Sequence, residues 1–165
     1  MDVITADIEQ ILTLLAETPQ RVAVLTSGLE QAQLNISPEQ DAWSVHTVLA
    51  HLRACADVWG KSILTMLAED QPTLRYVSPR TWIRKTDYLE QEFQASFQAF
   101  AQQRADLIAS LSSLASVDWS RAATFTGTVR GRDQTVFSYA RRIVDHERQH
   151  LEQIENIVSA LQLAG

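Results

Sequence analysis

The chain has 165 residues, of which 45% are hydrophobic and 21% are charged, and its formal net charge is −6. This length fits one domain with a single hydrophobic core, and the composition excludes general disorder. The acidic balance argues against a nucleic-acid-binding surface, which needs a basic footprint. Five glycines and four prolines are too few for the many turns of a β-sandwich or β-barrel.

Several features of the sequence favour the cytoplasm. Cys55 is the only cysteine, so the chain forms no internal disulfide, as is usual in reducing compartments. Residues 1–4 lack the basic flank and apolar block of a signal peptide. The strongly apolar stretches are far shorter than a membrane span. We therefore predict a cytoplasmic protein without a membrane segment.

Amphipathic helical patterns occupy the first part of the chain. Over residues 4–29, apolar residues recur at steps of three and four, as on the core-facing side of a helix. Pro19 interrupts this segment, so we expect either a kinked helix or two helices with Thr18 as the N-cap of the second. The second segment begins after Ser44, which is a good N-cap, and is expected to end at about Glu69.

Two connections without clear periodicity separate the later segments. Residues 70–87 contain two prolines, and we predict a long connection of the kind that is often functional. The third helical segment covers residues 93–114. After a second irregular stretch over residues 116–133, the fourth helix is expected from about residue 134 to residue 163. Four long helices predict an all-α four-helix bundle as a single domain over residues 1–165.

Histidines lie beside the apolar faces of two of these helices. At about 100° per residue, His146 and His150 share one side of the fourth helix, one turn apart. His51 lies at the edge of the apolar stripe of the second helix, whereas His46 falls on its polar side and is expected to be solvated. Three imidazoles can hold one metal ion and leave a position open, as in catalytic zinc sites. The pattern predicts a metal site of His51, His146 and His150, and the alternative for each is a hydrogen-bonded histidine at the core boundary.

Residues 146–150 read His-Glu-Arg-Gln-His, which also matches the signature of zinc peptidases. Only residues 151–165 follow, too few for a distant glutamate ligand on a further helix. Gln153 and Asn156 stand where the extended motif has glycine and histidine. The context therefore disfavours a peptidase.

Glu147 and Cys55 are further candidate site residues. Glu147 falls near the middle of the apolar arc of its helix, where a carboxylate needs a partner or loses its charge. It could orient a ligand imidazole, act as a catalytic base, or pair with Arg104, which interrupts the apolar stripe of the third helix. We take Glu147 as the candidate catalytic residue. Cys55, one turn after His51, is a small core residue or a fourth ligand that would close the site.

The two histidine-containing stretches resemble the DinB-like (damage-inducible, YfiT-related) superfamily. The stretches read W-S-V-H-T-V-L-A-H-L over residues 43–52 and D-H-E-R-Q-H-L-E-Q-I over residues 145–154. Asp118-Trp119 and residues 125–134 also look similar to the family pattern. The order and spacing of these motifs extend the resemblance over essentially the full chain.

The resemblance implies a four-helix bundle with up-down-down-up connectivity. It also implies a divalent metal ion, zinc or nickel, held by histidines that match His51, His146 and His150. Relatives include thiol-dependent S-transferases and isomerases that use low-molecular-weight thiols such as mycothiol or bacillithiol. Dimers are frequent among them, which implies a homodimer here.

Motifs and resemblance together predict a divalent-metal-dependent enzyme that acts on a small-molecule substrate. The leading hypothesis is a thiol-dependent S-transferase acting on small electrophiles, with a low-molecular-weight thiol as co-substrate. A metal-dependent hydrolase of a small substrate needs the same ligands and is the alternative within enzymes. The third alternative is a non-enzymatic bundle that the metal stabilises. No nucleic acid or membrane partner is expected.

Overall fold

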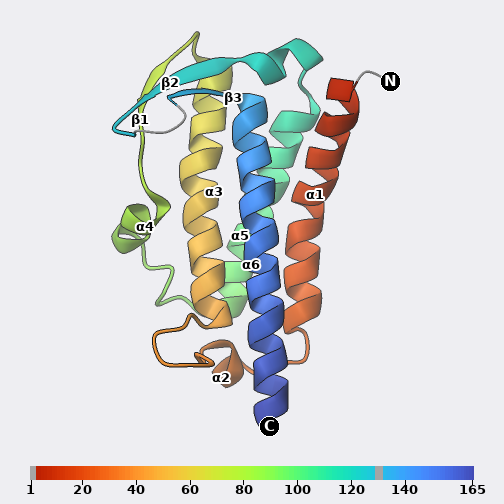
Figure 1. The fold of residues 1–165 in the computed structure, drawn as a ribbon, viewed down its shortest axis with the longest axis vertical. Coiled ribbons are helices and arrows are strands. Elements are labelled where there is room, and N and C mark those ends of the chain that lie inside the picture. The colour runs from red at the N-terminus through yellow and green to blue at the C-terminus, as the bar shows by residue number, and fades with distance from the viewer. Residues whose placement is uncertain (1–2, 129–131) are drawn as a thin grey trace.

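The computed structural model describes residues 3–128 and 132–165, and a bundle of long helices dominates it (Figure 1). The bundle consists of α1 (Val3–Thr26), α3 (Val45–Ala68), α5 (Phe93–Ser112) and α6 (Val136–Ala164). Both α1 and α3 pack against α5 and α6. Since α1 and α6 run in one direction and α3 and α5 in the other, the predicted up-down-down-up connectivity is confirmed (Figure 1).

Side-chain caps explain where two of these helices begin. The Oγ atom of Ser44 accepts a hydrogen bond from the backbone N–H of Thr47 at 3.1 Å, so α3 starts where the sequence predicts. At the start of α6, Thr135 and Ser138 bond to each other's backbone N–H groups in a capping box. The short helix α2 (Gln31–Leu34) lies between α1 and α3.

The first helix continues through Pro19 instead of dividing into two. Proline has no backbone N–H, so it cannot bond to the carbonyl oxygen of Leu15, four residues earlier. Arg104 of α5 takes this place, because its Nη1 atom donates to the Leu15 oxygen at 3.1 Å. A neighbouring helix therefore supplies the donor that the proline removes.

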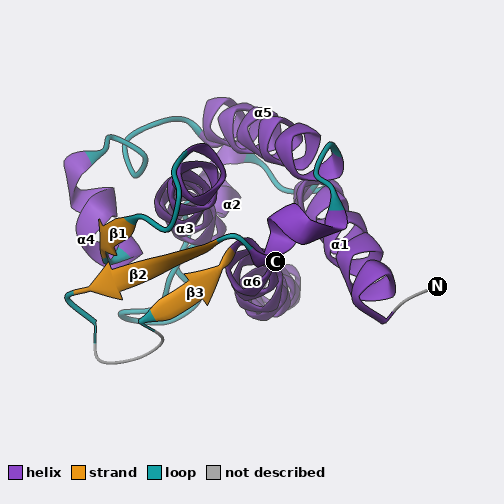
Figure 2. Cartoon of the chain, turned by 90° about the horizontal axis from the view of Figure 1, so that it is seen from above, coloured by secondary structure: helices purple, strands orange, loops and turns teal. Residues whose placement is uncertain are grey.

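The two connections contain short strands, whereas the sequence predicts irregular chain there. The first holds β1 (Thr73–Arg75), and the second holds β2 (Ala122–Thr126) and β3 (Asp133–Thr135). β1 pairs in parallel with β2, and β2 pairs antiparallel with β3, so the two connections form one sheet beside α3 and α6 (Figure 2). The sheet is a minor part of the molecule, and the four-helix-bundle class is confirmed.

Short helices complete the connections. The first carries α4 (Pro79–Trp82) and the 3-10 helix Ile83–Lys85, and the second carries the 3-10 helix Ser116–Ser120. Residues 129–131 of the predicted second connection, and residues 1–2 of the N-terminal stretch, lie outside the described residues.

The bundle core consists of two apolar clusters, the first around Leu15, Ile63 and Tyr139 and the second around Val22, Leu49 and Ile154, with buried and half-buried polar side chains between them. On α6, Val144 belongs to the first cluster and Leu151 to the second, and the histidines and Glu147 lie between these two positions. Arg104 occupies the corresponding place on α5. None of the described helices has the length and apolar character that a membrane crossing requires.

Candidate metal centre

Side chains from α3 and α6 bring three potential metal-ligand atoms together in this polar layer. The Nε2 atoms of His51 and His146 lie 3.0 Å apart. The Sγ atom of Cys55, one turn after His51, lies 3.4 Å from each of these nitrogens. These three atoms form a triangle in which all of them lie within 4.8 Å of one another, close enough to hold one metal ion.

His150 packs directly beside this triangle. Its ring centroid lies 4.8 Å from that of His51 and 4.4 Å from that of His146, with both ring pairs close to edge-on. Its Nδ1 atom lies 2.7 Å from the Oε1 atom of Gln153. An amide oxygen only accepts, so Nδ1 carries the hydrogen and the free lone pair of neutral His150 lies on Nε2. The structure thus brings the rings of all three predicted histidines together, but among the described residues the group of ligand atoms within 4.8 Å of one another contains His51, Cys55 and His146, not His150.

Burial keeps the imidazoles neutral in the metal-free protein. Burial and the positive charges of His150 and Arg80 lower the pKa of His51 from 6.5 to about 4. Burial and neighbouring cations, His150 first, likewise lower the pKa of His146 to about 4, and burial lowers the pKa of His150. Burial also raises the pKa of the Cys55 thiol. Neutral imidazole is the form that binds a metal ion, whereas the thiol has to lose its proton.

The donor set fits a divalent transition-metal ion. In a tetrahedral zinc site, bonds of about 2.0–2.1 Å to nitrogen and about 2.3 Å to sulfur separate two nitrogens by about 3.3 Å and a nitrogen from a sulfur by about 3.6 Å. The observed separations of 3.0 Å between the nitrogens and 3.4 Å between nitrogen and sulfur are a few tenths of an ångström shorter. Imidazole also suits nickel and iron, and thiolate favours zinc over magnesium or calcium.

Glu147 is buried and forms a two-pronged ion pair with Arg104. The Nη1 atom of Arg104 donates to Oε2 of Glu147 at 2.8 Å, and its Nη2 atom donates to Oε1. Each of the two residues is 2% exposed. The pair confirms one of the roles considered for this carboxylate. Its negative charge also raises the pKa values of Cys55 and His150, so it acts on the donor cluster from nearby.

His46 is buried, and the prediction that it is solvated was wrong. It is 5% exposed, its Nε2 atom lies 3.2 Å from the carbonyl oxygen of Leu89, and its ring packs against Phe93. The chain that enters α5 covers this side of α3, which a helical wheel cannot show. His46 is absent from the metal-ligand cluster found among the described residues.

Two tryptophans enclose the histidine rings. Trp43, just before α3, stacks on His150 with ring centroids 6.0 Å apart and 8° between the planes, and it contacts His51 at 5.1 Å. Trp59 meets the His146 ring edge-on at 5.0 Å. Apolar rings on two sides reduce access of water to the donor atoms, which strengthens electrostatic interactions there.

Two arginines bring positive charge to the same region. The guanidinium carbon of Arg80, on α4, lies 5.9 Å from the Trp43 ring centroid, and its charge lowers the pKa values of all three histidines. Arg142 lies one turn before His146, and its guanidinium carbon is 5.0 Å from the ring centroid of Tyr139. Arg80 was missed by sequence reasoning because it belongs to the connection, where no helical periodicity predicts its neighbours.

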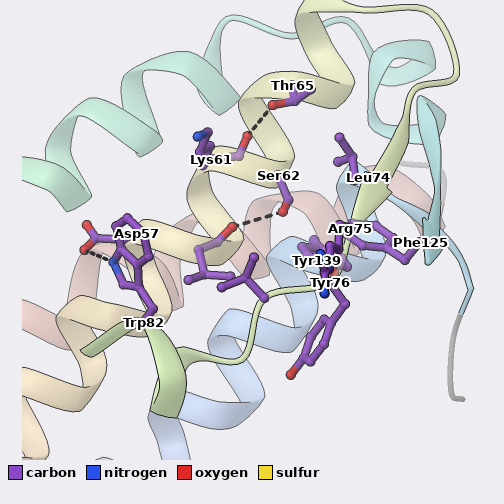
Figure 3. Close-up of a pocket in the computed structure, with 12 residues that line it drawn as sticks. Asp57, Lys61, Ser62, Thr65, Leu74, Arg75, Tyr76, Trp82, Phe125 and Tyr139 are labelled. Carbon is purple, nitrogen blue, oxygen red and sulfur yellow. Dashed lines mark hydrogen bonds between the residues drawn. The ribbon is translucent and has the colours of Figure 1, made fainter. Parts of the chain in front are cut away.

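A cavity of about 260 Å³ lies between the same two helices and the connections (Figure 3). Its walls are mainly apolar and aromatic and include Val58, Leu74, Tyr76, Trp82, Phe125 and Tyr139. At its edge, the Asp57 carboxylate accepts hydrogen bonds from Trp82 Nε1 at 3.0 Å and from the Tyr88 hydroxyl at 2.6 Å. These bonds attach the first connection to α3 and hold the cavity wall in place.

Comparison with known proteins places the chain among helical-bundle relatives. A family model described as the DinB superfamily matches residues 14–154. The structure is similar to that of YfiT from Bacillus subtilis, described as "a probable metal-dependent hydrolase with an unusual four-helix bundle topology", with a TM-score of 0.79 and 18% sequence identity. This match covers 91% of the present chain and 85% of the YfiT chain. No curated protein sequence matches the chain.

Proposed function

The chain belongs to the DinB superfamily, and from this premise we propose that it is a divalent-metal-dependent enzyme acting on a small molecule. The proposed ligands are His51, His146 and His150, with zinc or nickel as the ion. The proposed reaction is attack of a thiol sulfur on a small electrophile: the thiol loses its proton to solvent, a bond forms between sulfur and the electrophile, and the leaving group departs with its bonding electrons. The observation that carries the proposal is the convergence of three neutral imidazoles from two helices, one buried (His51) and two half-buried (His146 and His150).

The ion, when bound, would supply a positive charge that lowers the pKa of a thiol or a water molecule. His51 and His146 offer neutral nitrogen lone pairs from opposite helices, so binding requires no rearrangement of the backbone. Gln153 holds the Nδ1–H of His150 and leaves its Nε2 free for coordination. Trp43 covers the His150 ring and keeps water from that side.

The surroundings of the cluster support a substrate with an anionic group and an apolar part. Arg80 and Arg142 form no ion pair among residues 3–128 and 132–165, so their charges are available to a ligand. The nearby carboxylate of Glu147 is already paired with Arg104, so it is not the partner of Arg80 or Arg142. None of the proposed ligands lines the aromatic cavity, so the proposal requires the apolar part of the electrophile to extend from the ion into it.

We propose that Glu147, the candidate catalytic residue, acts by positioning, because both of its oxygens bond to Arg104. Its charge favours the protonated forms of His150 and Cys55, so it influences how these groups exchange protons. The variant Glu147→Gln should shift the pH profile of activity toward lower pH. A merely structural role would lower activity equally at every pH.

Hydrolysis of a small ester or amide is the second candidate. The description of YfiT as a probable metal-dependent hydrolase favours it. The same three histidines would serve, and water would take the place of the thiol.

Turnover by metal-loaded protein distinguishes these reactions. The purified protein is depleted of metal, reloaded with zinc or nickel, and assayed with model electrophiles and esters, with and without a low-molecular-weight thiol. Thiol-dependent turnover supports S-transfer, and thiol-independent ester cleavage supports the hydrolase. If neither occurs although chelation lowers the melting temperature, the metal only stabilises the bundle.

Two variants provide the matched comparison for this assay. His150→Ala should abolish turnover, because it removes a proposed ligand. His46→Gln removes a buried imidazole outside the cluster and should retain turnover. Unchanged activity of His150→Ala would contradict the proposed site.

The expected homodimer and cytoplasmic location stay predictions. A reducing cytoplasm would keep a thiol co-substrate in its active form. Sedimentation of the purified protein tests the dimer, and fractionation of cells tests the location.

A further inference from the structure

The position of Cys55 is unlike that of an ordinary core cysteine. It is 3% exposed, and its Sγ atom faces two imidazole nitrogens at 3.4 Å instead of apolar carbon atoms alone. Both nitrogens belong to proposed metal ligands, His51 and His146. An ion bound to this pair of nitrogens would therefore lie close to the sulfur.

The helical spacing gives Cys55 the same relation to His51 that His150 has to His146. Each pair lies one turn apart on its helix, and the two helices face each other across the polar layer. Cys55, His51 and His146 have their ligand atoms within 4.8 Å of one another. His150 lies outside this group, but its ring centroid is 4.4 Å from that of His146. With His150 as the fourth donor, the thiolate and imidazole of α3 would oppose the two imidazoles of α6, and four is the number of donors that tetrahedral zinc takes.

We propose that the Cys55 thiolate is a direct ligand of the ion, which makes the centre a mixed imidazole–thiolate site of His51, Cys55, His146 and His150. This inference rests on the proposed function, since it requires the same ion. Coordination forms a metal–sulfur bond, breaks the S–H bond, and releases the proton to solvent. The thiolate reduces the net charge of the centre by one and selects thiophilic ions such as zinc over magnesium or manganese.

A thiolate ligand also changes what a substrate meets. Four protein donors complete a tetrahedral shell, so a co-substrate would have to enter as a fifth ligand, as occurs in some catalytic zinc sites. The variant Cys55→Ala would open a position that small anions can occupy. Exogenous azide should therefore alter the spectrum of the cobalt-loaded variant more strongly than that of the cobalt-loaded wild type.

Cobalt(II) titration of the reduced, metal-free protein tests the proposal directly. Cys55 is the only cysteine, so a thiolate-to-cobalt charge-transfer band in the near ultraviolet has only one possible source. We expect this band to saturate together with the visible cobalt bands in the wild type. In Cys55→Ala the visible bands should persist while the charge-transfer band is lost.

The possible outcomes separate this inference from the proposed function. Visible cobalt bands without a charge-transfer band in the wild type would overturn the thiolate ligand and leave a three-histidine site. Absence of all cobalt bands would overturn the proposed function and this inference with it. The isosteric variant Cys55→Ser replaces Cys55→Ala if the latter does not fold. Zinc-edge X-ray absorption of the wild type, which needs no variant, should show a sulfur neighbour.

Discussion

The hydrogen bond from Arg104 to the Leu15 carbonyl oxygen predicts an energetic coupling between Pro19 and Arg104. Pro19 leaves this carbonyl without its helical partner, and Arg104 supplies the replacement. In the variant Pro19→Ala, the backbone N–H of residue 19 can bond to Leu15 in the ordinary helical way. Loss of Arg104 should therefore matter less when the proline is absent.

The expected magnitudes follow from burial of the groups involved. Arg104→Met leaves the Glu147 carboxylate buried without its partner, and breaking such a pair costs about 3–5 kcal/mol of unfolding free energy. The unsatisfied Leu15 carbonyl adds about 1–3 kcal/mol. The Pro19→Ala background removes this second contribution, so the two substitutions should couple by about 1–3 kcal/mol. Pro19→Ala alone should stabilise the protein, by less than the roughly 3 kcal/mol typical for proline inside a helix.

Urea unfolding followed by far-ultraviolet circular dichroism measures the coupling from the wild type, both single variants and the double variant. Pro38→Ala, at an exposed turn outside α1, is the control and should show no coupling with Arg104→Met. If Arg104→Met leaves too little native protein, Arg104→Lys keeps a charge near Glu147 but cannot make the same forked contact. Additivity of Pro19→Ala and Arg104→Met within about 0.5 kcal/mol would refute the reasoning.

Three further predictions concern the metal centre and its surroundings. Zinc at about 100 times its dissociation constant should stabilise the protein by about 2.7 kcal/mol and raise its melting temperature by roughly 5–10 °C. His146→Ala should remove this shift. An unchanged melting temperature of the wild type would contradict metal binding. The metal-free protein should lose stability as pH falls from about 6.5 to about 4. In this range His51 and His146 bind protons in the unfolded chain but not in the folded protein, because folding lowers their pKa values to about 4. One such imidazole corresponds to about 3 kcal/mol, and urea unfolding of His51→Gln should show a shallower pH dependence than the wild type. Asp57→Asn should lower the pKa of Tyr88 from about 12 and speed hydrogen exchange in residues 76–90, whereas unchanged exchange would show that these bonds do not hold the connection.

The helices and the histidine cluster could be predicted from the sequence because both depend on helical periodicity. A helical wheel places His146 and His150 on one side of α6 and Glu147 toward the core, and the structure confirms the pairing of Glu147 with Arg104. Convergence of His51 with the α6 histidines needed the additional assumption that α3 and α6 are neighbours. The bundle topology provides that contact.

The features that sequence reasoning missed depend on contacts between segments far apart in the chain. Pairing of Thr73 with Thr124 creates the sheet, but strands of three to five residues carry too little periodicity to be recognised. Arg80 approaches the cluster from the first connection, and Leu89 covers His46 from the same connection. A helical wheel gives the direction of a side chain, not the identity of the chain that meets it.

The proposed metal ligands belong to the helices and the cavity walls largely to the connections, which bears on how related proteins could come to recognise different substrates. The atoms that would hold the ion come from α3 and α6, whereas Leu74, Tyr76, Trp82 and Phe125 of the connections shape the aromatic cavity, which none of the proposed ligands lines. Substitutions in those segments can change the size and polarity of the recognised molecule without moving the nitrogen and sulfur donors. Proteins with the same metal ligands could therefore act on different compounds if only their connections differ in sequence.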